Sequence, residues 1–176
     1  MAHERLMNRA VVRVAPSAEG EDAAEFLQGL LTNDVTGALP AYSGLLTAQG
    51  KTLFDLIVWP AGEGALLLDC EAAVADDLVK RLSMYRLRRK LTVAVDPTLG
   101  VYWQATQGDG GARDPRLAAL GQRWIAKTDP GDIAVDGAWL AHRLALGVPE
   151  GRAELGDVLW LETNAWPAGR CRASPC

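Results

Sequence analysis

The chain contains few of the residues that build metal centres. Its 176 residues include three cysteines and two histidines, and two of the cysteines, Cys171 and Cys176, lie at the end of the chain. Zinc sites use Cys, His or carboxylate ligands at recognisable spacings, and no such spacing occurs here. An odd number of cysteines in this arrangement does not form a disulfide framework either. We therefore predict no metal site and a reduced, cytoplasmic protein.

Long hydrophobic runs and nucleotide-binding loops are also missing. No apolar stretch approaches the roughly 20 residues that cross a membrane, and no signal peptide precedes the first apolar segment. The G-x-x-x-x-G-K-[ST], G-x-G-x-x-G and G-x-S-x-G motifs do not occur. We therefore expect no membrane partner, and neither a P-loop or Rossmann enzyme nor an α/β-hydrolase. Hydrophobic residues make up 49% and charged residues 23% of the chain, as in ordinary globular proteins.

Positive charge is scarce except in one place. The net charge is −4, which argues against a nucleic-acid partner. Residues 80–90, KRLSMYRLRRK, nevertheless carry six bases and no acid. This stretch is either a solvated helix end whose bases complement the helix dipole, or a binding site for a small anionic ligand.

The hydrophobic pattern predicts an α+β fold with mixed, largely antiparallel sheets and packed helices. Strands that follow one another through short turns, with helices interspersed, favour this class over a doubly wound parallel sheet. Strands are predicted at 9–15, 42–48, 53–60, 65–70, 91–95, 99–106 and 122–127, helices at 21–31, 72–87 and 138–147, and a surface loop at 108–115.

One carboxylate stands out within this pattern. Asp55 lies in the strand LFDLIV, on the same face as Leu53 and Ile57. Apolar neighbours at both ends desolvate a carboxylate and raise its pKa unless a donor satisfies it. Such a group is suited to accept hydrogen bonds from the N–H groups of a nitrogen heterocycle. The alternative is an ordinary edge or capping Asp. His142, in an apolar helix, is interpreted as structural.

Three ordered segments resemble a known family. They are FLQGLLTNDVT at 26–36, LLTAQGKTLFDLIV at 45–58 and DDLVKRLSMYRLRRKLTV at 76–93. Together they are similar to the N-terminal part of YgfZ-type folate-binding proteins, which are relatives of the T-protein (aminomethyltransferase) of the glycine cleavage system. The resemblance runs from about residue 10 to 96 and continues more weakly through 141–165.

The resemblance implies a T-protein-like fold that binds tetrahydrofolate or another folate derivative. It implies an accessory protein that supports folate-dependent maturation or repair of iron–sulfur proteins, with folate and iron–sulfur client proteins as partners. An aminomethyltransferase-like one-carbon transferase is the alternative, with Asp55 as its catalytic candidate. That alternative is weakened because Phe54 replaces one of two adjacent acids. The implied folate contacts are Asn33, Gln49, Lys51, Asp55, Tyr85, Arg86 and Arg89, the basic residues being positioned for the carboxylates of the folate tail.

The same resemblance divides the chain into three parts. Residues 1–96 are predicted to form a first folate-binding subdomain, and 97–165 a second, incomplete one. Residues 166–176 form an atypical tail, because the family's Lys-Gly-Cys-Tyr-x-Gly-Gln-Glu motif does not follow residue 165. The sequence thus resembles a C-terminally truncated family member, and a truncated protein that keeps the fold with little function is a further alternative.

Overall fold

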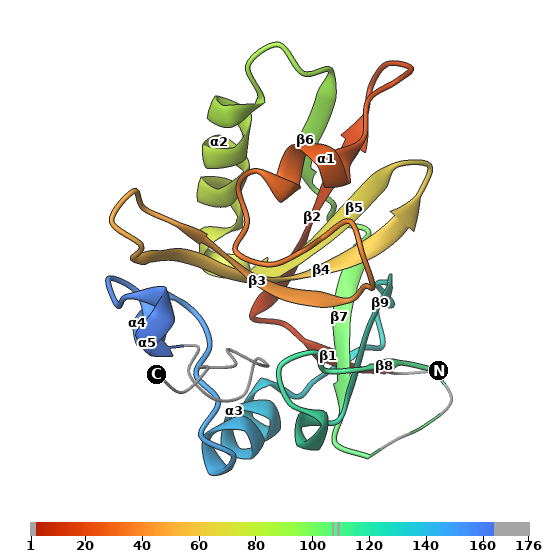
Figure 1. Ribbon diagram of the computed structural model, residues 1–176. Helices are drawn as coiled ribbons and strands as arrows, with labels where there is room; N and C mark the ends of the chain where they lie inside the picture. Colours follow the sequence, from red (N-terminus) through yellow and green to blue (C-terminus); the bar gives the residue numbers. More distant parts are fainter. Residues whose placement is uncertain (1–2, 107, 109, 164–176) are drawn as a thin grey trace.

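In the described part of the chain, the strands form two five-stranded sheets that stack against each other (Figure 1). The structure is a computed structural model, and it describes residues 3–106, 108 and 110–163. The predicted tail at 166–176, with Cys171 and Cys176, lies outside the described residues.

The first sheet is built from residues 9–95 and has the strand order β3-β4-β5-β2-β6. Its neighbouring strands are all antiparallel, and the β3-β4-β5 meander confirms the hairpins predicted from the turn residues. The strands are β2 (Arg9–Pro16), β3 (Ala41–Leu46), β4 (Thr52–Gly62), β5 (Ala65–Glu71) and β6 (Leu91–Val95).

The second sheet has the order β10-β1-β7-β9-β8. Its strands are β1 (Glu4–Leu6), β7 (Leu99–Gln104), β8 (Ala112–Arg113), β9 (Gln122–Lys127) and β10 (Ile133–Ala134). Within the described residues β1 and β10 pair in parallel, and the other strand pairs are antiparallel. The predicted α+β class with largely antiparallel sheets is therefore confirmed. Strand β1 comes from the predicted first subdomain but joins this sheet, so the chain crosses between the sheets near residue 8 and again near 96.

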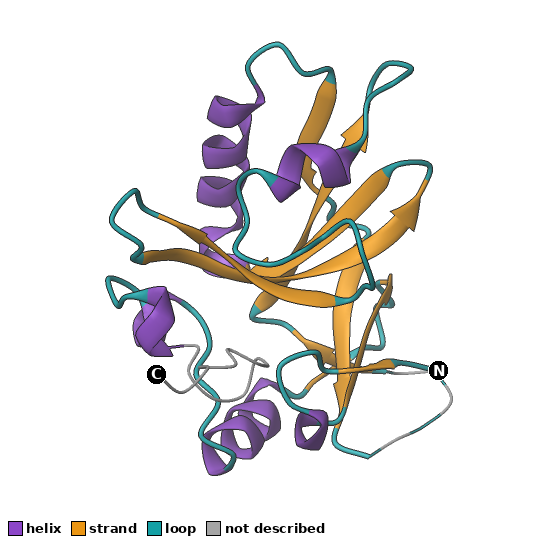
Figure 2. Ribbon diagram, in the orientation of Figure 1, coloured by secondary structure: helices purple, strands orange, loops and turns teal. Residues whose placement is uncertain are grey.

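Short helices cover the sheets (Figure 2). They are α1 (Ala23–Gln28), α2 (Ala75–Arg86), α3 (Asp136–Ala145), α4 (Arg152–Leu155) and α5 (Trp160–Thr163), with 3₁₀ turns at Ala72–Val74 and Ala118–Leu120. Helix α1 begins where the Asp22 carboxylate accepts hydrogen bonds from the N–H groups of Ala24 and Glu25, at 2.7 and 3.1 Å. This is N-capping, which satisfies donors that the helix itself leaves unpaired.

Side chains along the strands of the first sheet point alternately to its two faces, and each face packs into a separate hydrophobic core. Val12, Leu56 and Leu68 point to the face covered by α1 and α2, where they pack against residues such as Leu78. Residues one position along, such as Ile57, point to the opposite face and pack against the second sheet and α3. The side that Asp55 shares with Ile57 is therefore the interface between the two sheets.

Most predicted boundaries differ from the structure by one to three residues, and two differences have a clear physical reason. The predicted loop at 108–115 contains the two-residue strand β8, which pairs with β9. Helix α3 begins at Asp136, where its carboxylate accepts hydrogen bonds from the N–H groups of Met7 and Asn8. Strand β8 is too short to show a period, and the start of α3 depends on partners 128 and 129 residues away, which local periodicity cannot indicate. Among the described helices, none is long and apolar enough to cross a membrane.

Candidate functional site

Asp55 lies on β4 at the interface between the two sheets, with only 5% of its surface exposed. Its Oδ1 accepts a hydrogen bond from the Gly151 N–H at 3.1 Å. Its Oδ2 is buried and has no hydrogen-bond partner among the described residues. Burial raises the pKa of Asp55 above 3.8, against the opposing effect of the Arg9 guanidinium. The desolvated carboxylate expected from the flanking apolar residues is thus present.

Gly151 orients this carboxylate from the other end of the chain. It has φ +81°, a left-handed conformation that favours glycine, and a Cβ there would lie 3.1 Å from the Glu71 carboxylate. The next residue, Arg152, donates its backbone N–H to Glu71 Oε2 at 2.8 Å. These contacts fix the beginning of α4 against the end of β5, and they hold the Gly151 N–H towards Asp55.

A buried network of charges lies beside Asp55 in the same interface. It contains three arginines and three carboxylates, so its formal charges balance: Arg9, Arg116 and Arg123 with Asp69, Asp114 and Glu150. The residues come from both sheets and from the loops around the second sheet. The network therefore joins parts of the chain that are far apart in sequence.

Arg123 on β9 is a fully buried member of the network. Its Nη1 contacts Asp69 Oδ2 at 2.7 Å, and its Nη2 and Nε lie 3.5 and 3.6 Å from Glu150 and Asp114. The other oxygen of Asp69 accepts from Arg9 Nε at 2.6 Å. One carboxylate on β5 thus bridges an arginine of its own sheet and an arginine of the second sheet.

Glu150 carries the other end of the network. It accepts from Arg116 Nη1 at 2.7 Å and from the Trp139 indole N–H at 2.9 Å. Burial alone would raise the pKa of Glu150, but the attraction of Arg9, Arg116 and Arg123 outweighs it and holds that pKa well below 4.5. The ionised Glu150 precedes Gly151 directly, so the network also fixes the residue that orients Asp55.

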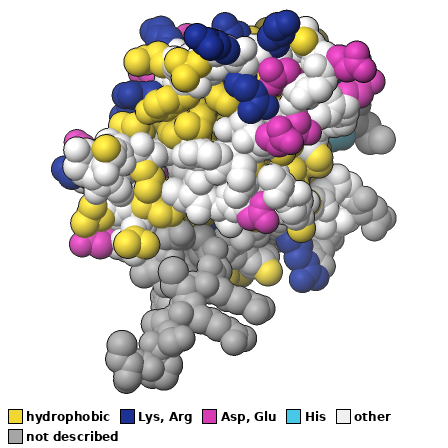
Figure 3. Space-filling model, turned by 45° about the horizontal axis from the view of Figure 1, so that its top comes forward, with side chains coloured by type: hydrophobic (Ala, Val, Ile, Leu, Met, Phe, Trp, Pro, Cys, Tyr) yellow, Lys and Arg dark blue, Asp and Glu magenta, His cyan; other side chains and the backbone are white. Residues whose placement is uncertain are grey.

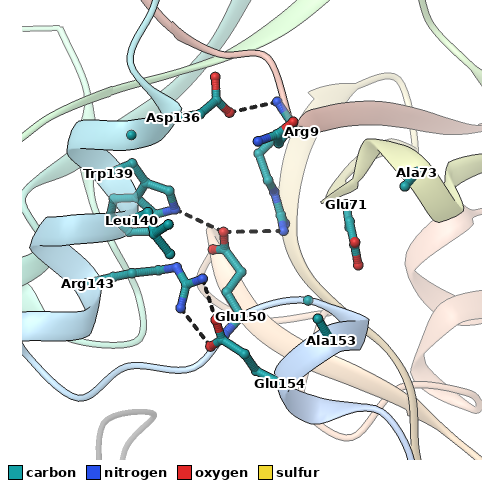
Figure 4. Close-up of a pocket in the computed structure, with 13 residues that line it drawn as sticks. Arg9, Glu71, Ala73, Asp136, Trp139, Leu140, Arg143, Glu150, Ala153 and Glu154 are labelled. Carbon is teal, nitrogen blue, oxygen red and sulfur yellow. Dashed lines mark hydrogen bonds and ion pairs between the residues drawn. The ribbon is translucent and has the colours of Figure 1, made fainter.

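A pocket of about 560 Å³ opens next to the network, between α3, α4 and the start of β2 (Figure 4). Trp139, Leu140 and Arg143 line one side of it, and Arg9 and Glu71 line the other. A second, much smaller cavity of about 10 Å³ lies beside Asp55 itself. Glu71 and Gly151 line both, so the larger pocket and Asp55 are separated by these two residues.

Three further predicted contacts lie near β3, the edge strand that pairs with β4. Asn33 is exposed after α1, and its amide Nδ2 donates to the Tyr42 carbonyl on β3 at 3.0 Å. Gln49 and Lys51 are exposed in the turn between β3 and β4, where both backbone N–H groups donate to Thr47 Oγ1. The structure therefore brings Asn33, Gln49 and Lys51 to the two strands that carry Asp55 and its neighbours.

Tyr85, Arg86 and Arg89 lie elsewhere, at the end of α2, a helix that covers the opposite face of the first sheet from Asp55. Arg86 donates to the Leu91 carbonyl at 2.6 Å, and Arg89 pairs with Glu21 at 2.6 Å. These bonds hold the helix end, which favours the structural interpretation of the basic stretch. In Figure 3, basic side chains lie beside hydrophobic ones at the top of the molecule. The structure does not bring these three residues together with Asp55.

The charge network was not predicted from the sequence. The signal available was an arginine or acid within an apolar strand, as in RAVVRVA and ALLLDC, which contain Arg9 and Asp69. His142 fits its predicted structural role, because its ring packs on Trp103 and its Nε2 lies 2.9 Å from the Ala119 carbonyl. The described residues contain no group of three or more metal-ligating side chains that could hold an ion.

Fold and site together define an α+β protein with a buried, half-satisfied carboxylate between two sheets, a site suited to a ligand that donates hydrogen bonds. The chain is 37% identical to the human mitochondrial iron–sulfur cluster assembly factor IBA57 over 200 residues, covering 91% of this chain and 55% of that protein. It is 32% identical to the mitochondrial IBA57 homologue of Neurospora crassa over 187 residues, covering 84% of this chain and 42% of that protein.

The chain thus spans about half the length of the curated relatives it matches. No family model matches the chain. The structure of the glycine cleavage system aminomethyltransferase T from Bartonella henselae is similar with a TM-score of 0.47 and 23% identity, over 57% of this chain and 28% of that one. The prediction of a cytoplasmic protein is contradicted, because these IBA57 relatives are described as mitochondrial.

Proposed function

We propose that the chain is a tetrahydrofolate-binding accessory protein that acts in the maturation of iron–sulfur proteins. The observation that carries this proposal is the 37% identity to an iron–sulfur cluster assembly factor over 91% of the chain. The three segments that resemble YgfZ-type proteins support the folate part of the proposal, and they contain Asp55 and the β3–β4 turn. Iron–sulfur client proteins are the proposed macromolecular partners.

The chemistry of Asp55 supports a folate as the ligand. Tetrahydrofolate has a nitrogen-rich bicyclic ring system with N–H donors, and its N5 and N10 nitrogens carry one-carbon units. A buried carboxylate oxygen without a partner is costly, and a ligand N–H that donates to it removes this cost. Asp55 Oδ2 is such an oxygen, and the Gly151 N–H holds the other oxygen of the same group. Asp55 would bind and orient the ring of the folate.

The charge network would keep this carboxylate in place. Glu150 is held by Arg116 and Trp139, and it immediately precedes Gly151, whose N–H fixes the orientation of Asp55. A binding group that is oriented before the ligand arrives loses less conformational entropy on binding. In this proposal Asp55 contacts the folate, and the buried arginines and acids hold Asp55 in position.

The test is a titration of the purified protein with folinic acid, followed by quenching of its tryptophan fluorescence. We expect saturable quenching in the wild type and a loss of affinity of about tenfold or more in Asp55→Asn, which keeps the shape of the side chain and removes its charge. Asp76→Asn, an exposed carboxylate on α2, is the matched control and should bind like the wild type. Absence of wild-type binding at millimolar folinic acid would contradict the folate proposal.

The client part of the proposal has its own test. Cells that lack the gene should lose activity of iron–sulfur enzymes while keeping the amounts of those proteins. Wild-type protein and Asp76→Asn should restore the activity, and Asp55→Asn should not. Restoration by Asp55→Asn would separate the role in iron–sulfur maturation from the proposed folate site.

A further inference from the structure

The end of α2 exposes apolar side chains instead of burying them. Leu87 is 87% exposed, Met84 is 67% exposed and Tyr85 is 39% exposed. Tyr85 and Leu87 line an open groove of about 780 Å³ together with three arginines of the same segment. Figure 3 shows hydrophobic side chains beside basic ones at the top of the molecule, where Figure 1 places the end of α2. Single exposed apolar residues are ordinary, whereas a group of them around a groove is typical of an interaction surface.

The backbone of Leu87 adopts a conformation that favours glycine. Its φ is +47° and its ψ is −110°, a region that residues with a Cβ rarely enter. The side chain of Leu87 is almost fully exposed, so packing within the described protein gives little stabilisation in return. Strained residues that the fold itself does not use are typical of functional positions. We therefore interpret Leu87 as a residue that contacts another molecule.

Two arginines beside the groove have no hydrogen-bond or ion-pair partner in the described part of the chain. They are Arg88, which lines the groove, and Arg81, which lies one helical turn before Tyr85 on the same side of α2. Arg86 and Arg89 differ from them, because their guanidinium groups are held by partners within the fold. Free positive charge next to exposed apolar groups is complementary to a partner that presents negative charge next to apolar groups.

Acidic residues limit the extent of this positive surface. Glu21 and Glu25 lie on one side of it, 2.6 and 3.7 Å from the Arg89 guanidinium. Asp77 lies towards the start of the helix, 3.6 Å from Lys80. A membrane surface or a nucleic-acid backbone presents negative charge over a wide area, so it would meet these acids as well as the arginines. An acidic segment of a protein is narrow enough to avoid them, and its apolar side chains can enter the groove.

We propose that the groove at the end of α2 is a docking surface for an acidic segment of a partner protein. An apolar side chain of that segment packs against Leu87, and its carboxylates pair with Arg81 and Arg88. Helix α2 covers the opposite face of the first sheet from Asp55, so a docked partner leaves the proposed folate site free. The inference therefore goes beyond the proposed function and does not depend on it.

The first experiment measures the fluorescence anisotropy of a fluorescein-labelled amphipathic peptide that has leucines on one face and acidic residues on either side of them. We expect saturable binding by the wild type and binding weaker by about tenfold or more in Arg88→Glu. Lys127→Glu, which reverses an exposed base on β9 in the second sheet, is the matched control and should bind like the wild type. The same peptide with amides in place of its acids should also bind about tenfold more weakly.

Three results of this experiment would overturn the proposal. The first is no binding of the acidic peptide at millimolar protein. The second is equal weakening by Arg88→Glu and Lys127→Glu, which would show general attraction between opposite charges without a docking surface. The third is binding of the protein to vesicles of phosphatidylcholine and phosphatidylserine without binding of the peptide, which would assign the surface to a membrane.

A second experiment separates docking from a structural role of Leu87. Leu87→Gly removes the apolar side chain and relieves the backbone strain, so its Tm should be no lower than that of the wild type. Its affinity for the acidic peptide should nevertheless fall by about tenfold or more. Folinic acid binding should be unchanged in Leu87→Gly and Arg88→Glu, because the surface lies away from Asp55. A lower Tm with undiminished peptide binding would show that Leu87 serves the fold and would overturn the proposal.

Discussion

Replacing Glu150 with Gln tests whether the buried charge network holds the two sheets together. Gln has the same shape and can still accept from Trp139, but it leaves Arg116 and Arg123 with one carboxylate fewer. Removing one partner from a buried ion pair costs about 3–5 kcal/mol, since the remaining charge stays buried. For a domain of this size that loss lowers Tm by about 6–20 °C.

The assay is thermal unfolding followed by far-UV circular dichroism at several pH values. The pKa of Glu150 is held well below 4.5 in the folded protein, so its contribution is complete above pH 4.5 and is lost as pH falls through the lower, folded value. The difference in Tm between wild type and Glu150→Gln should therefore be full at pH 7 and shrink in acid. Asp77→Asn is the control, because Asp77 is exposed and 3.6 Å from Lys80. A change below 2 °C for Glu150→Gln at pH 7 would refute the reasoning.

Three further changes have defined outcomes in the same unfolding assay. Asp55→Asn should raise Tm at neutral pH by about 2 °C or more. Burial raises the pKa of Asp55, so the wild type loses stability as pH rises from the pKa of the unfolded chain to the raised pKa of the folded protein. An unchanged or lower Tm would contradict this. Asp22→Ala removes the N-cap of α1 and should cost about 0.5–2 kcal/mol, whereas an unaltered urea midpoint would show that the cap is dispensable. Leu78→Ala, in the α2 core, should cost about 2–5 kcal/mol, and a loss below 1 kcal/mol would mean that the core closes over the gap.

The role of Asp55 explains why a stabilising change is expected at this position. A carboxylate that is buried with one oxygen unpaired destabilises the folded protein, and such groups are retained where a ligand uses them. Asp55→Asn should therefore gain stability and lose folinic acid binding. A gain in stability with undiminished binding would separate the two effects and remove Asp55 from the site.

Local patterns in the sequence were sufficient for most of the fold. Alternating apolar residues and turn signals located the β3-β4-β5 meander, and the apolar stripe with acids at its start located α2. Strands β1 and β10 were missed because they have three and two residues, and β1 gains its order by pairing across more than 90 residues of sequence. A segment that short has no period to detect.

The site was predictable only in part, for a related reason. The burial of Asp55 was indicated by the apolar residues around it in the strand, of which Ile57 lies on the same face. The charge network consists of residues from position 9 to position 150, and apart from Arg9 and Asp69, which lie in apolar strands, its members resemble ordinary surface charges in the sequence. The basic stretch at residues 80–90 was noticed in the sequence, but its role was not settled there. Its charge was visible in the sequence, but the partners of Arg86 and Arg89, which are the Leu91 carbonyl and Glu21, were not.

The most direct test of the central claim, that Asp55 accepts hydrogen bonds from a folate ring, is the titration of its carboxyl carbon by ¹³C NMR. The resonance is assigned by its absence in Asp55→Asn. We predict a pKa above 3.8 in the free protein and a lower pKa with saturating folinic acid, because N–H donors favour the ionised carboxylate. A pKa that is the same with and without bound folinic acid would contradict the claim.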